Sequence, residues 1–201
     1  ASVSQALAVA GNTQVGFAIV GGNEHASLWN GTAASWKDLN PVGASQSQAT
    51  GVTSTYQAGY AAFANNYHAG IWNGTAASWV DLHPAGATSS VVSAASGNLQ
   101  VGSVQIGGVF RASLWNKTAA SWVDLSTFMV GNWGNTLANG VWTDGVTTVI
   151  VGSGYNVASN LLEAIIWVQA AACPADFNAD QVVDDLDFQL FAAAYNIVLC
   201  S

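Results

Sequence analysis

Residues 28–36 have the sequence Leu-Trp-Asn-Gly-Thr-Ala-Ala-Ser-Trp, and nearly the same nine residues return at 71–79 and 114–122. Self-similarity at a fixed period of about 20 to 50 residues is typical of solenoid, propeller and array proteins. The repeat therefore predicts an architecture of tandem structural units. The first Trp of each copy lies 43 residues after the previous one, at Trp29, Trp72 and Trp115.

Each repeat predicts four short β-strands, which in the first copy are residues 4–10, 14–20, 24–30 and 35–39. Gly, Asn and Pro separate these segments, which are rich in β-branched, aromatic and small residues. Four strands in one 43-residue unit are typical of a propeller blade. We therefore expect an all-β fold, a β-propeller-like array of about four four-stranded blades, over residues 1–170.

A degenerate fourth copy ends at Trp167, after nine inserted residues between Ser126 and Gly145. It provides the first three strands, but no Ser-Trp-Val-Asp-Leu segment follows, so its last strand is missing. An unpaired sheet edge is a template for pairing with further chain. We expect another part of the chain or a neighbouring subunit to fill this edge, and the second option would produce a filament.

Charged residues are scarce and mostly negative. Only 7% of the 201 residues are charged, and the formal net charge is −8. The three cations, Lys37, Arg111 and Lys117, cannot form a basic surface, so we expect no binding to nucleic acid or to an anionic membrane. No apolar run approaches the ~20 residues that span a bilayer, so we also expect no membrane insertion.

Cys173 and Cys200 flank the most acidic part of the chain. An even cysteine count in this composition favours a disulfide and an oxidising compartment, with two free buried thiols as the alternative. Between them, oxygen-bearing side chains occupy positions 1, 3, 5, 9 and 12 of a loop, and position 7 offers a carbonyl. This is the pattern of an EF-hand-type Ca²⁺ loop. The expected ligands are Asp176, Asn178, Asp180, Val182, Asp184 and Asp187.

Electrostatic repulsion also favours a cation in this loop. Two carboxylates 4 Å apart repel each other by about 4 kcal/mol at an effective dielectric constant of ~20. The residues after the loop, 186–196, have helical spacing, and a solvated acidic helix start is the alternative interpretation. We expect residues 171–201 to form a small calcium-loop and helix module closed by the disulfide.

Two segments resemble known families. The pattern His25-Ala-Ser-Leu-Trp, then Trp36-Lys-Asp-Leu and Ser47-Gln-Ala-Thr-Gly-Val, is similar to the HAF extracellular repeat of bacterial secreted proteins, which implies an extracellular β-propeller. The acidic segment, Ala-Asp-Phe-Asn-Ala-Asp-x-x-Val-Asp-Asp-x-Asp-Phe, resembles half of a type I dockerin module, with Gln181 at the usual Gly and Asp187 at the usual Glu. Because only one half is present, a fold-stabilising Ca²⁺ is a better interpretation than cohesin docking.

Several other residue types recur at fixed phases of the repeat. The Asn-x-Thr sequons are candidate glycosylation sites, although an Asn-Gly hairpin turn is the alternative. They begin at Asn30, Asn73 and Asn116. Trp residues at one phase usually pack one blade against the next. The two Trp residues of the irregular region, Trp133 and Trp142, are instead candidate ligand-binding residues.

Charged and histidine residues also follow the repeat. His25, His68, Arg111 and Glu163 share one phase, and equivalent blade positions can converge into a polar ring, but this is a poor metal-ligand set. Asp38, Asp81 and Asp124 share another phase and are expected to fix turns or to form hydrogen bonds with the backbone.

No nucleophile elbow, phosphate-binding Gly loop or metal-spaced His pair occurs in the sequence. We therefore expect a secreted, non-catalytic structural or assembly protein of the bacterial cell surface or of an extracellular filament. It would associate with itself or with other surface proteins. The alternative is a lectin-like propeller that binds carbohydrate or protein.

Overall fold

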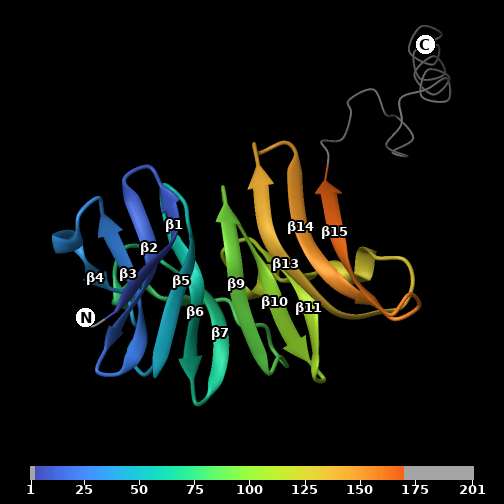
Figure 1. Ribbon diagram of the computed structural model, residues 1–201, viewed down its shortest axis with the longest axis horizontal. Helices are drawn as coiled ribbons and strands as arrows, with labels where there is room; N and C mark the ends of the chain where they lie inside the picture. The colour runs from blue at the N-terminus through green and yellow to red at the C-terminus, as the bar shows by residue number, and fades with distance from the viewer. Residues whose placement is uncertain (1–2, 170–201) are drawn as a thin grey trace, which may run out of the picture. The chain divides into compact units, whose positions relative to one another are not determined.

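The structure is a computed structural model that describes residues 3–169. These residues form four antiparallel sheets, each built from consecutive strands of the chain (Figure 1). The predicted all-β fold is confirmed. The predicted calcium-binding module, with Cys173 and Cys200, lies outside the described residues.

The strands follow the repeat, and each sheet has its strands in chain order. The first sheet contains β1 (Ser4–Ala10), β2 (Thr13–Val20), β3 (Asn23–Asn30) and β4 (Lys37–Asp38). The second contains β5 (Gln46–Val52), β6 (Gln57–Phe63), β7 (Asn66–Trp72) and β8 (Val80–Asp81). The third contains β9 (Ser89–Ser96), β10 (Leu99–Ile106), β11 (Val109–Trp115) and β12 (Val123–Asp124). The fourth contains β13 (Trp133–Thr143), β14 (Thr148–Asn156) and β15 (Leu161–Gln169).

The last segment of each repeat is shorter than the predicted strand. In the first repeat a 3₁₀ turn, η1 (Ala33–Ser35), precedes the two-residue strand β4. The Ser35 hydroxyl accepts a hydrogen bond from the Asn30 N–H and donates one to the Thr32 carbonyl. This local bonding curls the chain where the sequence predicts extension. The corresponding turns are η2 (Ala76–Ser78) and η3 (Ala119–Ser121), and a further turn, η4 (Leu125–Phe128), follows β12.

The described part of the fourth sheet has three strands, as the sequence predicts. The inserted residues do not all lie between Ser126 and Gly145. When the strand registers are aligned, some inserted residues lie in the connection before β13. The others lie in the β13–β14 and β14–β15 hairpin loops. Insertions accumulate there because hairpin loops tolerate added residues better than packed strands do.

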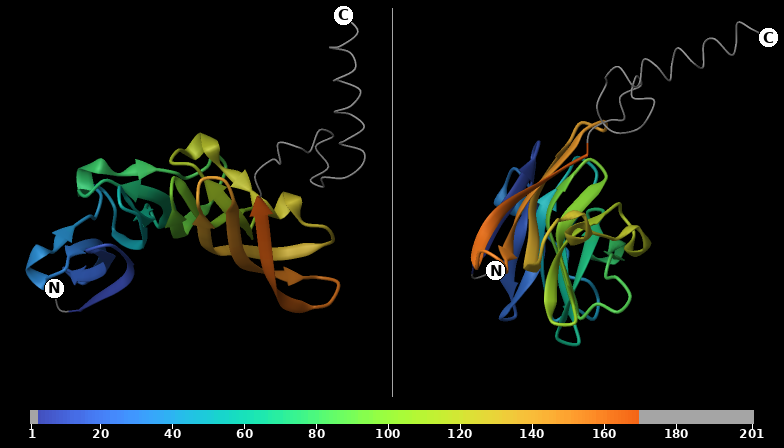
Figure 2. Two further views of the ribbon diagram at one scale, coloured as in Figure 1. Left: turned by 90° about the horizontal axis from the view of Figure 1, so that it is seen from above. Right: turned by 90° about the vertical axis from the view of Figure 1, so that its right-hand side faces the viewer.

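The sheets pack face to face in chain order, and the first strand of each sheet lies against the preceding sheet. Thus β5 packs on β1, β2 and β3, and β9 packs in the same way on the second sheet. Figure 2 shows the sheets of the described chain as an open row, with the first and fourth sheets at its two ends. No closed barrel or propeller ring is present among residues 3–169.

In the described part of the chain, no helix has the length and apolar character needed to cross a membrane.

Candidate functional site

Three equivalent junctions join the four sheets, and each contains the same buried hydrogen bond. The backbone N–H of an Ala in the third strand of one sheet donates to a hydroxyl on the first strand of the next sheet. The pairs are Ala26 to Ser47 (2.9 Å), Ala69 to Ser90 (2.8 Å) and Ala112 to Thr136 (2.8 Å). A buried N–H must be paired, so each hydroxyl fixes the position of the incoming strand.

Apolar side chains surround these hydrogen bonds. In the first junction, Val15, Leu28 and Leu39 of the first sheet pack with Ala49 and Trp72 of the second. The other two junctions repeat this cluster with equivalent residues. Trp72 and Trp115 are almost completely buried, at 1% and 0% exposed. For these two residues, the predicted role of Trp in packing one sheet on the next is confirmed.

The last sheet presents an apolar surface that no other described element covers. We define the open face as the side of the fourth sheet that is equivalent to the packed sides of sheets one to three. Its residues are Leu137, Val151, Leu162, Ala164 and Ile166. Val151 and Ile166 are 45% and 66% exposed, whereas their equivalents in the first sheet, Val15 and Leu28, are 0% and 4% exposed. Large exposed apolar patches mark interaction sites in many proteins, so the open face is a candidate site.

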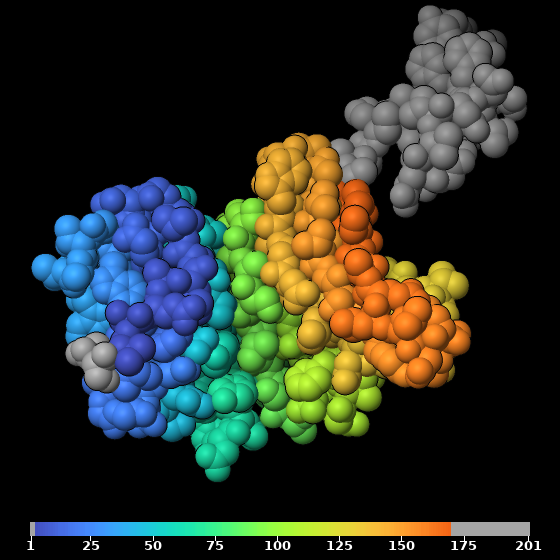
Figure 3. Space-filling view, viewed as in Figure 1, coloured from blue at the N-terminus to red at the C-terminus, as the bar shows by residue number. Residues whose placement is uncertain are grey.

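A second exposed face lies at the other end of the row. We define the β1 face as the side of the first sheet turned away from the second, formed by Ser4, Ala6, Val9, Trp29 and Trp36. Val9 is 66% exposed, whereas its equivalent Val52 is 8% exposed. Figure 3 shows the first and fourth sheets at opposite ends of the described row.

The charged residues of the repeat are paired inside their own sheets. The contacting pairs are His25 with Asp38, His68 with Asp81 and Arg111 with Asp124, each with a nitrogen–oxygen distance of 2.8 Å. The other carboxylate oxygen of each Asp accepts the N–H two residues later. The prediction that these carboxylates fix turns is confirmed. His25, His68 and Arg111 are thus each held by the Asp of the same sheet.

His83 lies at the second junction, where Asn40 and Ser126 occupy the equivalent positions in the other repeats. Its Nδ1 contacts the Ser90 hydroxyl at 2.8 Å, and its ring stacks on His68 with centroids 4.0 Å apart. Burial lowers the pKa of His83, so the neutral ring is favoured in the folded chain. Among residues 3–169, no three His, Cys, Asp or Glu side chains lie close enough together to hold a metal ion.

The three sequon Asn side chains are all exposed, in the turns that lead into the 3₁₀ segments. The second residue of each sequon has a positive φ, a conformation that favours Gly. Gly31 and Gly74 have φ of 73° and 76°, and Lys117 adopts φ of 61° at the same position. The N–H of each of these residues donates to a Gln side chain. The segment is thus a turn between a strand and a 3₁₀ segment, with an accessible Asn amide.

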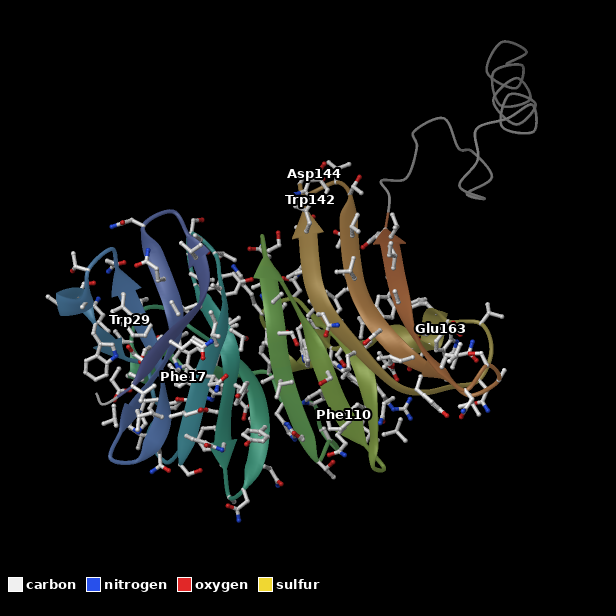
Figure 4. All side chains as sticks on the ribbon, in the orientation of Figure 1. Phe17, Trp29, Phe110, Trp142, Asp144 and Glu163 are labelled. Carbon is white, nitrogen blue, oxygen red and sulfur yellow. The ribbon has the colours of Figure 1, made fainter. Side chains whose placement is uncertain are left out.

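The two candidate ligand-binding Trp residues lie at opposite ends of the single strand β13 and are not brought together. Trp142 is 56% exposed beside the β13–β14 hairpin, near Asp144 (Figure 4). Trp133 is half-buried, and its indole N–H donates to the Val130 carbonyl at 2.9 Å. The repeat spacing is interrupted in this region of the sequence, but both Trp133 and Trp142 lie in a regular β-strand and not in a loop.

Sequence reasoning did not identify a shallow groove between the β5–β6 and β9–β10 hairpins. Residues 52–55 and 95–98 line about 400 Å³, with Ser, Thr and Asn side chains beside small apolar ones. Hairpin residues of this composition carry no distinctive signal, so only the packing of two neighbouring sheets reveals the groove.

Comparison with models of known protein families and with curated proteins finds no match for this chain. The described residues therefore have to be interpreted from their own geometry. That geometry provides two exposed apolar sheet faces, three accessible sequons and one exposed Trp at a hairpin.

Proposed function

We propose that this protein is a secreted, non-catalytic structural protein that assembles at a bacterial cell surface or in an extracellular filament. The open face carries this proposal. Ile166 and Val151 are much more exposed than the equivalent residues of the other sheets. A protein that remains alone in water rarely keeps such apolar area uncovered, whereas a subunit of an assembly covers it with a neighbour.

The sheets are interpreted as blades of a propeller-like array. Support comes from the repeated four-stranded antiparallel sheets and from the three equivalent junctions between them. The resemblance to the HAF repeat of bacterial secreted proteins supports the extracellular location. Exposed Asn30, Asn73 and Asn116 are compatible with glycosylation of an external surface.

Calcium is proposed to order the C-terminal module, residues 171–201. This part of the proposal rests on the sequence: five oxygen-bearing side chains and one carbonyl at EF-hand positions, from Asp176 to Asp187. A Cys173–Cys200 disulfide would close the module, as expected in an oxidising compartment.

Electron microscopy and light scattering test the assembly proposal. With about 10 mM Ca²⁺, which exceeds the dissociation constants of roughly 10⁻⁹–10⁻³ M of EF-hand-type sites, we expect the purified chain to form ordered particles larger than a monomer. We expect Ile166→Lys to prevent this. Val157→Lys is a matched control, because Val157 is also exposed but lies in the β14–β15 turn, outside the open face. A chain that stays monomeric and soluble at high concentration contradicts the proposal.

A second candidate function is glycan binding at Trp142. Its 56% exposure at the end of β13 is typical of an aromatic platform that stacks on a sugar ring. A glycan array that shows binding lost in Trp142→Ala would favour a lectin. Trp133→Ala is expected to leave such binding unchanged, because Trp133 lies at the opposite end of the strand.

A further inference from the structure

Each sheet junction is built from the same two halves. One half is a sheet face with an Ala N–H in its third strand, and the other is the hydroxyl of the next first strand, at most 1% exposed. Two residues after each hydroxyl, a small apolar residue is buried to the same depth. These residues are Ala49, Val92 and Ala138. A junction is therefore a defined pattern of hydrogen bonding and packing, more specific than general apolar contact.

The described chain also contains one copy of each half without its counterpart. Ala164 lies three residues before Trp167, as Ala26 does before Trp29, and it belongs to the open face. Ser4 lies 43 residues before Ser47, in the same pairing register with its second strand. Ser4 and Ala164 are both exposed, and within residues 3–169 neither makes the junction hydrogen bond.

The strand β1 already has the shape of a docked first strand. Its pairing shifts between Ala6 and Ala8, at the position where β5 and β9 have their bulges. The bulge places Val9 on the same side as Ser4, as Val52 is placed in the first junction. The β1 face therefore keeps the form needed to pack on a preceding sheet, although no described sheet precedes it.

We propose that a second copy of this chain places its β1 face on the open face and forms a fourth junction. The Ala164 N–H of one copy donates to the Ser4 hydroxyl of the other, and Val151 and Ile166 are covered by Ala6, Val9 and Trp29. This inference rests on the proposed function, because it names the partner and the contact of assembly.

The contact is heterologous, since each copy uses a different surface. Such contacts either close into a ring or continue into a filament, depending on the rotation between copies. Two copies would bring together eight sheets, which is within the range of about 4–8 blades in propellers. Pairing of like faces is disfavoured, because two open faces would bury two Ala164 N–H groups without a hydroxyl to accept them.

Two complementary variants test this contact by sedimentation velocity in the full chain. Ala6→Arg places a charged side chain on the β1 face, and Ile166→Lys places one on the open face. We expect each variant alone to be monomeric at concentrations where the wild-type chain associates. An equimolar mixture should form a 1:1 dimer and nothing larger. The open face of Ala6→Arg and the β1 face of Ile166→Lys are both intact and can form one junction, whereas the two other faces are blocked.

Ser4→Ala provides a milder test that leaves the apolar faces unchanged. We expect it to weaken association by about fivefold, as for one lost hydrogen bond, without changing the midpoint of thermal unfolding. Ser90→Ala is the matched control, because Ser90 forms the equivalent hydrogen bond within one chain. Its loss should lower the midpoint of thermal unfolding and leave association unchanged. Circular dichroism checks that each variant keeps its sheets, and Ile166→Ser replaces Ile166→Lys if the latter unfolds.

Three outcomes would overturn the inference: a wild-type chain that is monomeric throughout, a mixture that does not associate, or an Ala6→Arg chain that associates like the wild type. A monomeric wild-type chain overturns the inference whatever covers the open face, residues 170–201 included. If the variants complement each other and the wild-type chain forms only a closed dimer, the contact is supported and a filament is excluded. Filaments that persist in both variants keep the proposed function and reject the contact.

Discussion

At the scale of single residues, His83 shows how one side chain can change a repeated junction. In the first repeat the Asn40 amide oxygen accepts a hydrogen bond from the Ser47 hydroxyl, and in the second repeat the His83 ring takes its place beside Ser90. Asn cannot titrate near neutral pH, whereas His can. The second junction therefore contains a protonation site that the first junction lacks.

We predict that His83 makes folding stability depend on mild acid. Burial lowers its pKa from the usual value near 6.5, so the unfolded chain binds the proton first as the pH falls. The contribution of the neutral ring is complete above about pH 6.5 and is lost below it. The midpoint of thermal unfolding, measured from pH 8 to pH 5, should fall less in His83→Asn than in the wild type. Equal pH dependence in the two proteins would contradict this role.

At the scale of elements, each first strand bends at a bulge and each second strand has a Gly opposite the bend. A Cβ at Gly16, Gly59, Gly102 or Gly152 would lie 1.9–2.0 Å from a carbonyl oxygen of the neighbouring strand. The Gly is therefore required by close backbone approach, which no strand-propensity argument predicts. The bulge in turn sets which side chains of the first strand face the preceding sheet.

We predict that Gly102→Ala destabilises the folded chain by about 2 kcal/mol or more, because neither strand can move away without breaking its pairing. Gly140→Ala is the comparison, since its nearest neighbour is a methyl group of Val151 at 3.1 Å, which can rotate. Urea unfolding measures both free energies. Similar losses in the two variants would show that the bulge carbonyl is not the cause.

The connection after the third strand illustrates a limit of pattern-based prediction. The extended segment expected at residues 35–39 begins as a 3₁₀ turn, because the Ser35 hydroxyl accepts from the Asn30 N–H and donates to the Thr32 carbonyl. The same contacts recur at Ser78 and Ser121. A β-rich composition does not reveal which hydroxyl will bond to its own backbone.

At the scale of the whole molecule, the sheets form a row in which each contacts its neighbours in the chain. Such quasi-linear arrays derive their stability from each unit and from the interfaces between units. Within the described chain, the two end faces lack one interface each, and both contain exposed apolar residues such as Val9, Val151 and Ile166. The proposed assembly would repeat the same face-to-face packing between copies of the chain.

The calcium proposal predicts an effect confined to one end of the chain. Removal of Ca²⁺ with EDTA should make residues 171–201 sensitive to protease, because the carboxylates from Asp176 to Asp187 would repel each other without a cation. The β-sheet signal in circular dichroism should remain. Limited proteolysis with mass spectrometry locates the cut, and Asp180→Ala should reproduce it without EDTA. Unchanged protease resistance would reject a calcium site.

The amino-acid sequence alone was sufficient to predict the all-β class, the repeat, nearly all strand positions and the three strands of the fourth sheet that lie among residues 3–169. These features are local: each strand pairs with its neighbour in the chain across a short turn, so punctuation by Gly and Asn is sufficient to place them. Three features of residues 3–169 depend on tertiary structure: the row of sheets is open, Trp133 and Trp142 lie apart, and Ser4 and Ala164 are exposed. Burial depends on which sheet covers which face. Equivalent residues of two repeats can therefore differ in burial, because one has a neighbouring sheet and the other does not.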